Sequence, residues 1–242
     1  MEWVDDAIVL GARHFGEGKL VAEVFSREHG RYGGVVHAGR KSQPILQAGN
    51  LIHCGWKARL SEQLGFYNPL ELAEPHATRL LDDPLALAGL SSAISLIRGA
   101  TPERQAYPPL YDALMVLIEA MPHTDIWPAL YTRFELGLLA ALGYGLDLTR
   151  CAVTGETAGL AWVSPRTGRA ATHAAGAPHA DVLLRLPRFL VDTEAELNSG
   201  DVADAFALAG YFLERRVFEH KGEGMPDARR RLIERLGFAG RL

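Results

Sequence analysis

The amino-acid sequence changes character at Pro75, and this change constrains the possible folds more than any other feature. Upstream of Pro75, short runs rich in strand-forming residues are separated by glycine-containing turns. Downstream, the chain becomes rich in Leu and Ala with helical spacing. Apolar residues with a period of two indicate strands, whereas a period near 3.6 indicates helices. The pattern therefore predicts a β-rich N-terminal part followed by a mostly helical part.

Five strands are predicted before Pro75, at residues 7–13, 19–26, 32–37, 51–60 and 66–73. The fourth has the clearest pattern, because Cys54 and Trp56 share one side while His53 and Lys57 lie on the other. This alternation predicts a strand that is buried on one face and basic on its outer face. Five short antiparallel strands in a segment of this length fit a small closed barrel, most often the OB-fold.

Helices are predicted after Pro75, at residues 80–97, 109–121, 127–142, 201–220 and 227–236. Asp83 and Pro84 supply a cap and a first-turn proline near the start of the first of these. The segment at about 146–180 predicts a loop-rich insert. The predicted fold is therefore α+β and multidomain, with a five-stranded OB-fold β-barrel in residues 1–78 and an α-helical domain in residues 79–242 that carries the insert.

Charge is unevenly divided along the chain. Residues 11–59 hold eight basic and three acidic residues, a formal +5, although the whole chain is −4. Residues 60–207 hold nine basic and eighteen acidic residues, a formal −9. A basic module in an acidic chain favours binding of a polyanion such as DNA. The candidate DNA-binding residues are Arg13, Lys19, Arg27, Arg31, Arg40, Lys41, His53, Lys57 and Arg59.

Aromatic side chains in the same segment are candidates for stacking against bases. Single-stranded nucleic acids bind through phosphate contacts combined with aromatic platforms. Tyr32, Phe66 and Tyr67 are predicted to serve this purpose, whereas Trp56 lies on the apolar parity and is predicted to be core. Two alternatives stay open: a solvated strand face without a ligand, and an OB-fold module that binds protein or RNA within a larger complex.

Enzymatic motifs are absent from the sequence. It contains no phosphate-binding loop, nucleophile elbow or paired-histidine metal motif, so we expect a protein without catalytic residues. The first ten residues include three acidic ones, the wrong polarity for a secretory signal, and no apolar run approaches a membrane span. Two cysteines do not form a disulfide framework. These features predict a reduced cytoplasmic protein.

The insert begins at Cys151 and resembles a zinc knuckle that lacks most of its cysteines. A structural zinc site needs four ligands and usually contains a C-x₂-C pair. Here Thr154 occupies the second position and no cysteine follows it, while His173 and His179 have unconvincing spacing. We therefore expect no metal and no other cofactor.

Two segments carry a family resemblance. The runs are FSREHGRYGGVVHAGRKS, at residues 25–42, and RFELGLLAALGYGLDLTRCAVTGETAGLAWVSPRTGRA, at residues 133–170. In order and spacing they resemble the bacterial RecO family of DNA repair proteins, over essentially the full chain. The resemblance implies a nucleoid-associated recombination mediator that binds single- and double-stranded DNA, anneals complementary strands and helps load the RecA recombinase. Many members of this family bind zinc in the knuckle through two C-x₂-C pairs, and this sequence departs from that pattern.

The resemblance also implies protein partners. RecO-like proteins act with the ring-forming protein RecR, and their helical domain docks the acidic C-terminal tail of the single-stranded-DNA-binding protein. Arg98 and Arg133 are the candidates for holding that tail. A second basic cluster around residues 229–231 fits either another DNA contact or a solvated helix face. No membrane contact is implied.

Overall fold

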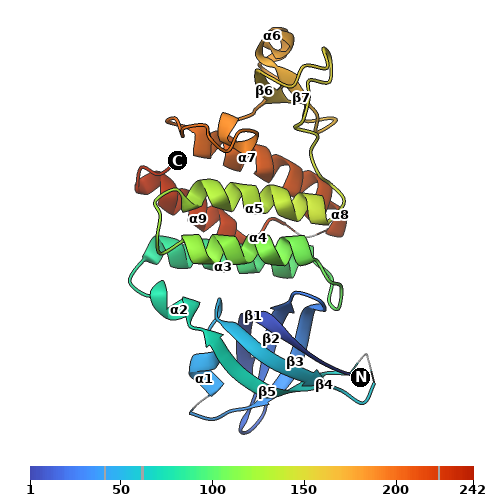
Figure 1. Cartoon of the computed structure of the whole chain (residues 1–242), viewed down its shortest axis with the longest axis vertical. Helices are drawn as coiled ribbons and strands as arrows, with labels where there is room; N and C mark the ends of the chain where they lie inside the picture. The colour runs from blue at the N-terminus through green and yellow to red at the C-terminus, as the bar shows by residue number, and fades with distance from the viewer. Residues whose placement is uncertain (41, 61–62, 223) are drawn as a thin grey trace. The chain divides into compact units, whose positions relative to one another are not determined.

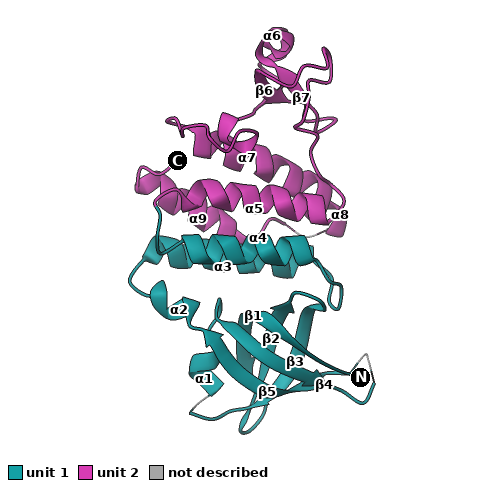
Figure 2. Ribbon diagram, in the orientation of Figure 1, with its two compact units in different colours: residues 1–124 teal, residues 125–242 magenta. Residues whose placement is uncertain are grey.

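The structure is a computed structural model that describes residues 1–40, 42–60, 63–222 and 224–242. These residues form two compact units, residues 1–124 and residues 125–242, coloured separately in Figure 2. We call them the first and the second unit and describe each by itself. The change from strands to helices falls between Glu74 and His76. The predicted domain boundary at residue 78 stays a prediction. Lys41, one of the predicted DNA-binding residues, lies outside the described residues.

The first unit contains a closed five-stranded barrel (Figure 1). Its strands are β1 (Glu2–His14), β2 (Lys19–Ser26), β3 (Gly30–His37), β4 (Leu51–Lys57) and β5 (Gly65–Glu74). They are joined in the order β1-β2-β3-β5-β4. This arrangement confirms the predicted OB-type barrel. One pairing differs from the prediction, because β3 and β5 run parallel rather than antiparallel.

Strand β1 is nearly twice as long as predicted because it pairs with two neighbouring strands. Its first half pairs with β4 and its second half with β2. Ala7 and Ile8 pair with both strands, and the register with β2 shifts between Val9 and Gly11. The acidic residues of the first half obscured the strand in the sequence. Glu2 and Asp6 point outward and pair with side chains of β4. Asp5 lies on the same parity as Trp3 and Ala7, is half-buried and accepts a hydrogen bond from the Ser26 hydroxyl.

The barrel core is built around aromatic rings. Trp56 is fully buried, as predicted, and its Nε1 donates a hydrogen bond to the Gly33 carbonyl at 3.0 Å. Tyr32 and Tyr67 are only 4% and 5% exposed, so their predicted role as stacking platforms is wrong. They face the same apolar interior as Trp56, and an aromatic ring there stabilises the fold by burial. Phe66, on the opposite side of β5, is 52% exposed.

Four helices complete the first unit as described. They are α1 (Ser42–Ile45), α2 (His76–Arg79), α3 (Pro84–Ala100) and α4 (Pro108–Ala120). Helix α3 begins four residues later than predicted, because Asp83 caps it by accepting hydrogen bonds from Leu85 N and Ala86 N. The side chain of Tyr111 on α4 contacts Phe25 of β2, so this helix packs on the barrel.

The second unit is mainly helical. Its helices are α5 (Trp127–Ala141), α6 (His173–Gly176), α7 (Asp201–Leu213), α8 (Glu219–Lys221) and α9 (Asp227–Phe238), with short 3₁₀ turns η1 (Ala177–His179) and η2 (Arg188–Leu190). The predicted helix at 201–220 is interrupted by a π-helical turn, η3 (Glu214–Phe218). Of the helices in the described ranges, none is long and apolar enough to cross a membrane.

The insert is more regular than the sequence suggested. Strands β6 (Leu160–Val163), β7 (Ala170–Thr172) and β8 (Leu184–Arg185) form a small sheet in the order β7-β6-β8. Short strands of two to four residues leave little periodicity in the sequence, so they were not predicted.

A buried ion pair joins two helices of the second unit. Arg229 of α9 donates from Nε and Nη2 to the two carboxylate oxygens of Glu135 on α5, at 2.5 and 2.9 Å. Its Nη2 also donates to the Phe206 carbonyl at 2.8 Å. Burial raises the pKa of Glu135, and the guanidinium acts in the opposite direction. Arg229 is therefore neither a solvated residue nor a DNA contact, in contrast to both sequence interpretations of the basic cluster.

Candidate nucleic-acid interface

The predicted basic face of β4 is neutralised by its neighbour. Because β1 runs antiparallel beside β4, Asp6 stands opposite His53 and Glu2 opposite Lys57. His53 Nδ1 lies 2.9 Å from Asp6 Oδ1, and Lys57 Nζ lies 3.0 Å from Glu2 Oε2. The β4 face thus carries alternating charges rather than a basic stripe.

Two further candidates are paired with carboxylates of the first unit. Arg27 donates to both carboxylate oxygens of Asp112, at 2.9 and 3.0 Å, and to Glu28 at 2.7 Å. The hydrogen bond from Arg27 lowers the pKa of the Asp112 carboxyl. The Arg31 side chain is only 13% exposed and contacts the Glu23 carboxylate and the Thr101 carbonyl. The Arg31 guanidinium is therefore directed into the fold, which argues against its predicted role as a DNA contact.

Three candidates gather around the turn between β1 and β2. Arg13 and Lys19 flank this turn, and Arg40 follows β3. The Ala38 amide donates to the Gly18 carbonyl at 2.9 Å, which ties the loop carrying Arg40 to the turn. All three residues are exposed, and none of their side chains has an ion-pair partner among the described residues. Phe15, at the start of the turn, is 45% exposed.

We call Arg13, Phe15, Lys19 and Arg40 the turn edge. Sequence reasoning missed Phe15, although its position between two basic residues was a usable signal. Arg59 is also exposed and lies in the β4–β5 connection, close in sequence to the exposed Phe66. In OB-folds the β1–β2 and β4–β5 connections border the face that binds oligonucleotides. Among the cations without ion-pair partners in the described residues, Arg13 and Lys19 flank the first of these connections and Arg59 lies on the second, whereas Arg40 lies between β3 and β4.

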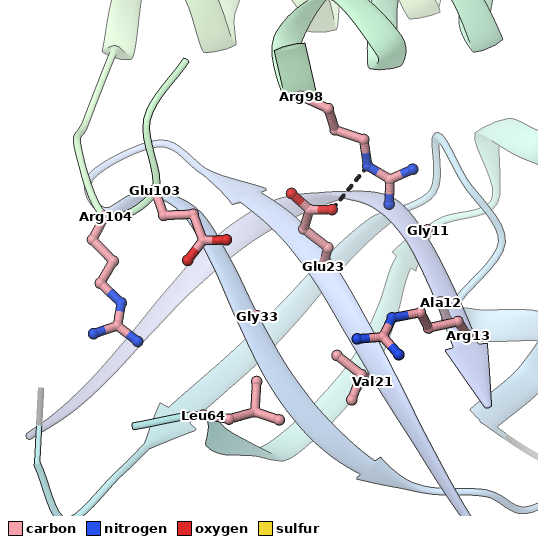
Figure 3. Close-up of a pocket in the computed structure, with 10 residues that line it drawn as sticks. All are labelled: Gly11, Ala12, Arg13, Val21, Glu23, Gly33, Leu64, Arg98, Glu103 and Arg104. Atoms are coloured by element: carbon pink, nitrogen blue, oxygen red, sulfur yellow. Dashed lines mark hydrogen bonds and ion pairs between the residues drawn. The ribbon is translucent and has the colours of Figure 1, made fainter. Parts of the chain in front are cut away.

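A groove of about 490 Å³ lies on the outer face of β1, β2 and β3 (Figure 3). Helix α3 and the segment after it contribute its other wall through Arg98, Glu103 and Arg104. Arg98 Nε donates to Glu23 Oε2 at 2.8 Å, and its guanidinium lies against Gly11. The candidate for tail binding at residue 98 thus faces the barrel and belongs to the groove of the first unit.

The other tail candidate, Arg133, lies on α5 in the second unit. Its guanidinium donates to the carbonyl oxygen of Phe189, and the residue is half-buried. The segment after Phe189 borders a pocket of about 1000 Å³ with many apolar side chains, including Leu160, Leu186 and Leu190. Arg133 does not line this pocket itself, but its guanidinium contacts the Phe189 carbonyl beside it; the arginine in the lining is Arg188, which pairs with Asp192.

The insert does not provide a zinc site within the described part of the chain. The Cys151 thiol is buried and accepts hydrogen bonds from the amides of Thr154 and Thr172, at 3.5 and 3.3 Å. Hydrogen bonds from Thr154 lower the pKa of Cys151 to about 6. The Thr154 hydroxyl donates to Glu156, and no group of three metal-ligating side chains occurs among the described residues. The Cys151 sulfur is thus surrounded by backbone amide donors.

The fold and this distribution of charge define an OB-barrel protein with a cationic turn edge and a helical second unit. Two family models match the chain: "Recombination protein O N terminal" over residues 1–76 and "Recombination protein O C terminal" over residues 81–223. The DNA repair protein RecO of Hyphomonas neptunium is 47% identical over 239 residues, covering 98% of both chains. The RecO proteins of Phenylobacterium zucineum and of a Caulobacter species are 48% and 46% identical over the full length of each chain. The chain belongs to the RecO family of DNA repair and recombination proteins.

Proposed function

We propose that this protein is a non-catalytic recombination mediator that binds single- and double-stranded DNA along the turn edge of its barrel. The observation that carries the proposal is the gathering of Arg13, Lys19 and Arg40 without ion-pair partners among the described residues, beside an exposed aromatic ring. Cations that are not neutralised within the fold are free to neutralise phosphates. Because phosphates are the same in every sequence, this binding is independent of sequence.

Strand annealing follows from the same surface. Two complementary strands repel each other through their phosphates, and a cationic surface lowers this repulsion by replacing condensed counterions. Annealing makes and breaks no covalent bond, so it requires no catalytic residue in the protein. Loading of RecA onto coated DNA, with RecR as partner, is the cellular task that we propose for this activity, in the cytoplasm at the nucleoid.

An annealing assay tests this function. We expect the protein to accelerate annealing of complementary oligonucleotides, both bare and coated with single-stranded-DNA-binding protein, and we expect affinity for DNA to fall linearly on a log–log plot against salt. The measurement is fluorescence quenching of paired labels over time, at several salt concentrations. Binding of RNA but not DNA, or affinity that does not depend on salt, would contradict the proposal.

We further propose that the coating protein's acidic tail binds the second unit. As the family resemblance implies, this tail ends in apolar residues. We propose that this end occupies the pocket bordered by Leu160, Leu186 and Leu190, and that Arg133, beside the Phe189 carbonyl, pairs with the tail's carboxylate. A guanidinium can donate two parallel hydrogen bonds to a carboxylate, which an ammonium group cannot match.

Replacing Arg133 by alanine should lower the affinity for a tail peptide by about tenfold, the effect of losing one charge-assisted contact. Affinity for bare DNA should be unchanged, because the DNA contacts lie on the barrel. Fluorescence anisotropy with a labelled tail peptide and a labelled oligonucleotide measures both. For peptide binding alone, Arg98→Ala is the matched control, since Arg98 contacts Glu23 in the groove of the first unit. Normal peptide binding by the Arg133 variant would exclude this site.

A further inference from the structure

The groove on the first unit combines apolar walls with groups that donate and accept hydrogen bonds. Val21 of β2 and Leu64 supply the apolar walls, and Gly33 of β3 lies on its floor. Because Gly33 has no side chain, the floor stays open: a Cβ there would come within 3.4 Å of the Leu64 side chain. In Figure 3 the side chains of Arg13 and Glu103 border the same space from opposite elements.

The groove is lined by charges of both signs. Glu23 binds Arg98 at 2.8 Å on one carboxylate oxygen and contacts Arg31 with the other. Glu103 adds a second carboxylate, which has no partner among the described residues. Three arginines and two glutamates thus line the groove, and Arg31, outside the lining, also contacts Glu23. Donors and acceptors placed side by side suit a neutral polar group better than an anion.

Arg104 is fixed in place on the wall of this groove. Its backbone has a φ of 63°, the left-handed region, and its amide donates to the Arg31 carbonyl at 2.8 Å. Its guanidinium donates to the Gln63 carbonyl at 3.1 Å. The guanidinium carbon lies 5.5 Å from the ring centre of Tyr32, which is in the barrel core. A planar cation held in this way can stack against a second planar group.

We propose that the groove receives one unstacked nucleobase of single-stranded DNA. The base would lie between Leu64, Val21 and the plane of Arg104, and its edge would donate to Glu103 and accept from Arg13. Arg13 also belongs to the turn edge, so the phosphates next to the bound base run onto that edge. This inference rests on the proposed DNA binding and adds to it a site for a base.

The groove would be used by single strands alone. In a duplex each base is stacked and paired, and extracting one costs a few kcal/mol. The turn edge holds phosphates of either form, whereas the groove adds affinity only when a base is free. The two sites together therefore account for binding of both forms with a preference for the single strand.

The test compares two oligonucleotides of equal length, one of thymidines and one with abasic sugars at every position. Both carry the same phosphates, so their difference in affinity isolates the bases. We expect the wild-type protein to bind the thymidine oligonucleotide about tenfold more tightly. Gly33→Val should fill the floor and remove most of this difference while abasic binding stays the same. Ala73→Val, at an exposed position of β5, is the matched control and should behave as wild type.

Glu103→Ala provides an independent readout that does not depend on packing in the strand. Removing this exposed carboxylate should strengthen binding to the abasic oligonucleotide, because one repulsive charge is lost, and should weaken the preference for bases. A groove that acts through charge alone would tighten both equally, and this result would overturn the proposal. Circular dichroism checks that both variants are folded.

Other outcomes are also decisive. Equal affinity of the wild-type protein for both oligonucleotides, with normal salt dependence, would overturn the base site and leave the proposed DNA binding intact. Failure to bind either oligonucleotide would instead refute the proposed function itself. An acidic tail peptide whose affinity falls in Gly33→Val would assign the groove to a protein ligand and overturn the inference.

Discussion

Replacing Arg229 by alanine is expected to destabilise the second unit by about 3–5 kcal/mol, the cost of leaving one charge of a buried pair without its partner. Glu135 is completely buried, and Arg229 supplies both hydrogen bonds to its carboxylate as well as one to the Phe206 carbonyl. A domain of this size is stable by about 5–15 kcal/mol, so the loss is a large fraction of the total. Urea denaturation followed by circular dichroism measures it.

Arg230→Ala is the matched control for this prediction. Arg230 is the next residue of α9, and its side chain is 63% exposed and pairs with Asp227 and Glu234. Because exposed pairs contribute about 0–1 kcal/mol, this variant should unfold almost as the wild-type protein does. Equal effects of the two variants would show that the buried pair has no special role in stability.

A double variant separates the loss of the pair from the burial of a lone charge. Glu135→Leu with Arg229→Met leaves no charge in the interior and keeps similar volume. Replacing a buried ion pair by apolar groups is often neutral. We therefore expect the double variant to recover most of the stability lost in Arg229→Ala. A double variant less stable than the single one would mean that the pair itself, and not the isolated Glu135, determines the stability.

The second large effect is expected at the turn edge. Replacing Arg13, Lys19 and Arg40 together by glutamine should reduce the slope of log affinity against log salt for duplex DNA by roughly 2.7, since each phosphate contact contributes about 0.9. If affinities converge near 1 M salt, this corresponds to about 10²–10³-fold weaker binding at 0.1 M. Titrations by fluorescence anisotropy at several salt concentrations measure the slope directly.

A second triple variant provides the same change of charge elsewhere on the first unit. Arg27, Lys57 and Arg79 are exposed, but each has a carboxylate partner within 3.0 Å. Replacing these three by glutamine should change the slope by less than about one unit, because their charge is already compensated within the fold. Equal losses in the two triple variants would show that net charge, and not the turn edge, governs DNA binding.

The barrel and the long helices were predictable because their patterns are local. The alternation around Trp56 and the capping pair Asp83-Pro84 each report on a few neighbouring residues. The parallel pairing of β3 with β5 was not predictable, since it joins segments about thirty residues apart. The first half of β1 was missed because Asp5 interrupts the apolar parity of Trp3 and Ala7.

The site was harder to predict because charge compensation is a property of neighbours in space. His53 and Lys57 form a basic stripe in the sequence, but their partners Asp6 and Glu2 come from a strand about fifty residues earlier. Arg229 follows the same rule, because Glu135 lies 94 residues away. The excess of cations in residues 11–59 was visible in the sequence. The structure adds which of these cations have no ion-pair partner among the described residues.

For the proposed DNA binding, the pairing of charges between β1 and β4 affects how DNA associates with the first unit. One face of the barrel is electrically neutral, while the turn edge is positive, so the first unit has a charge asymmetry that can orient an approaching polyanion before contact. Such steering acts over about a Debye length, near 10 Å at 0.1 M salt. The glutamine variant of the turn edge should therefore lose much of its affinity through slower association, which stopped-flow mixing resolves from dissociation. In the proposed encounter, the face with paired charges would leave the turn edge as the favoured point of approach for DNA.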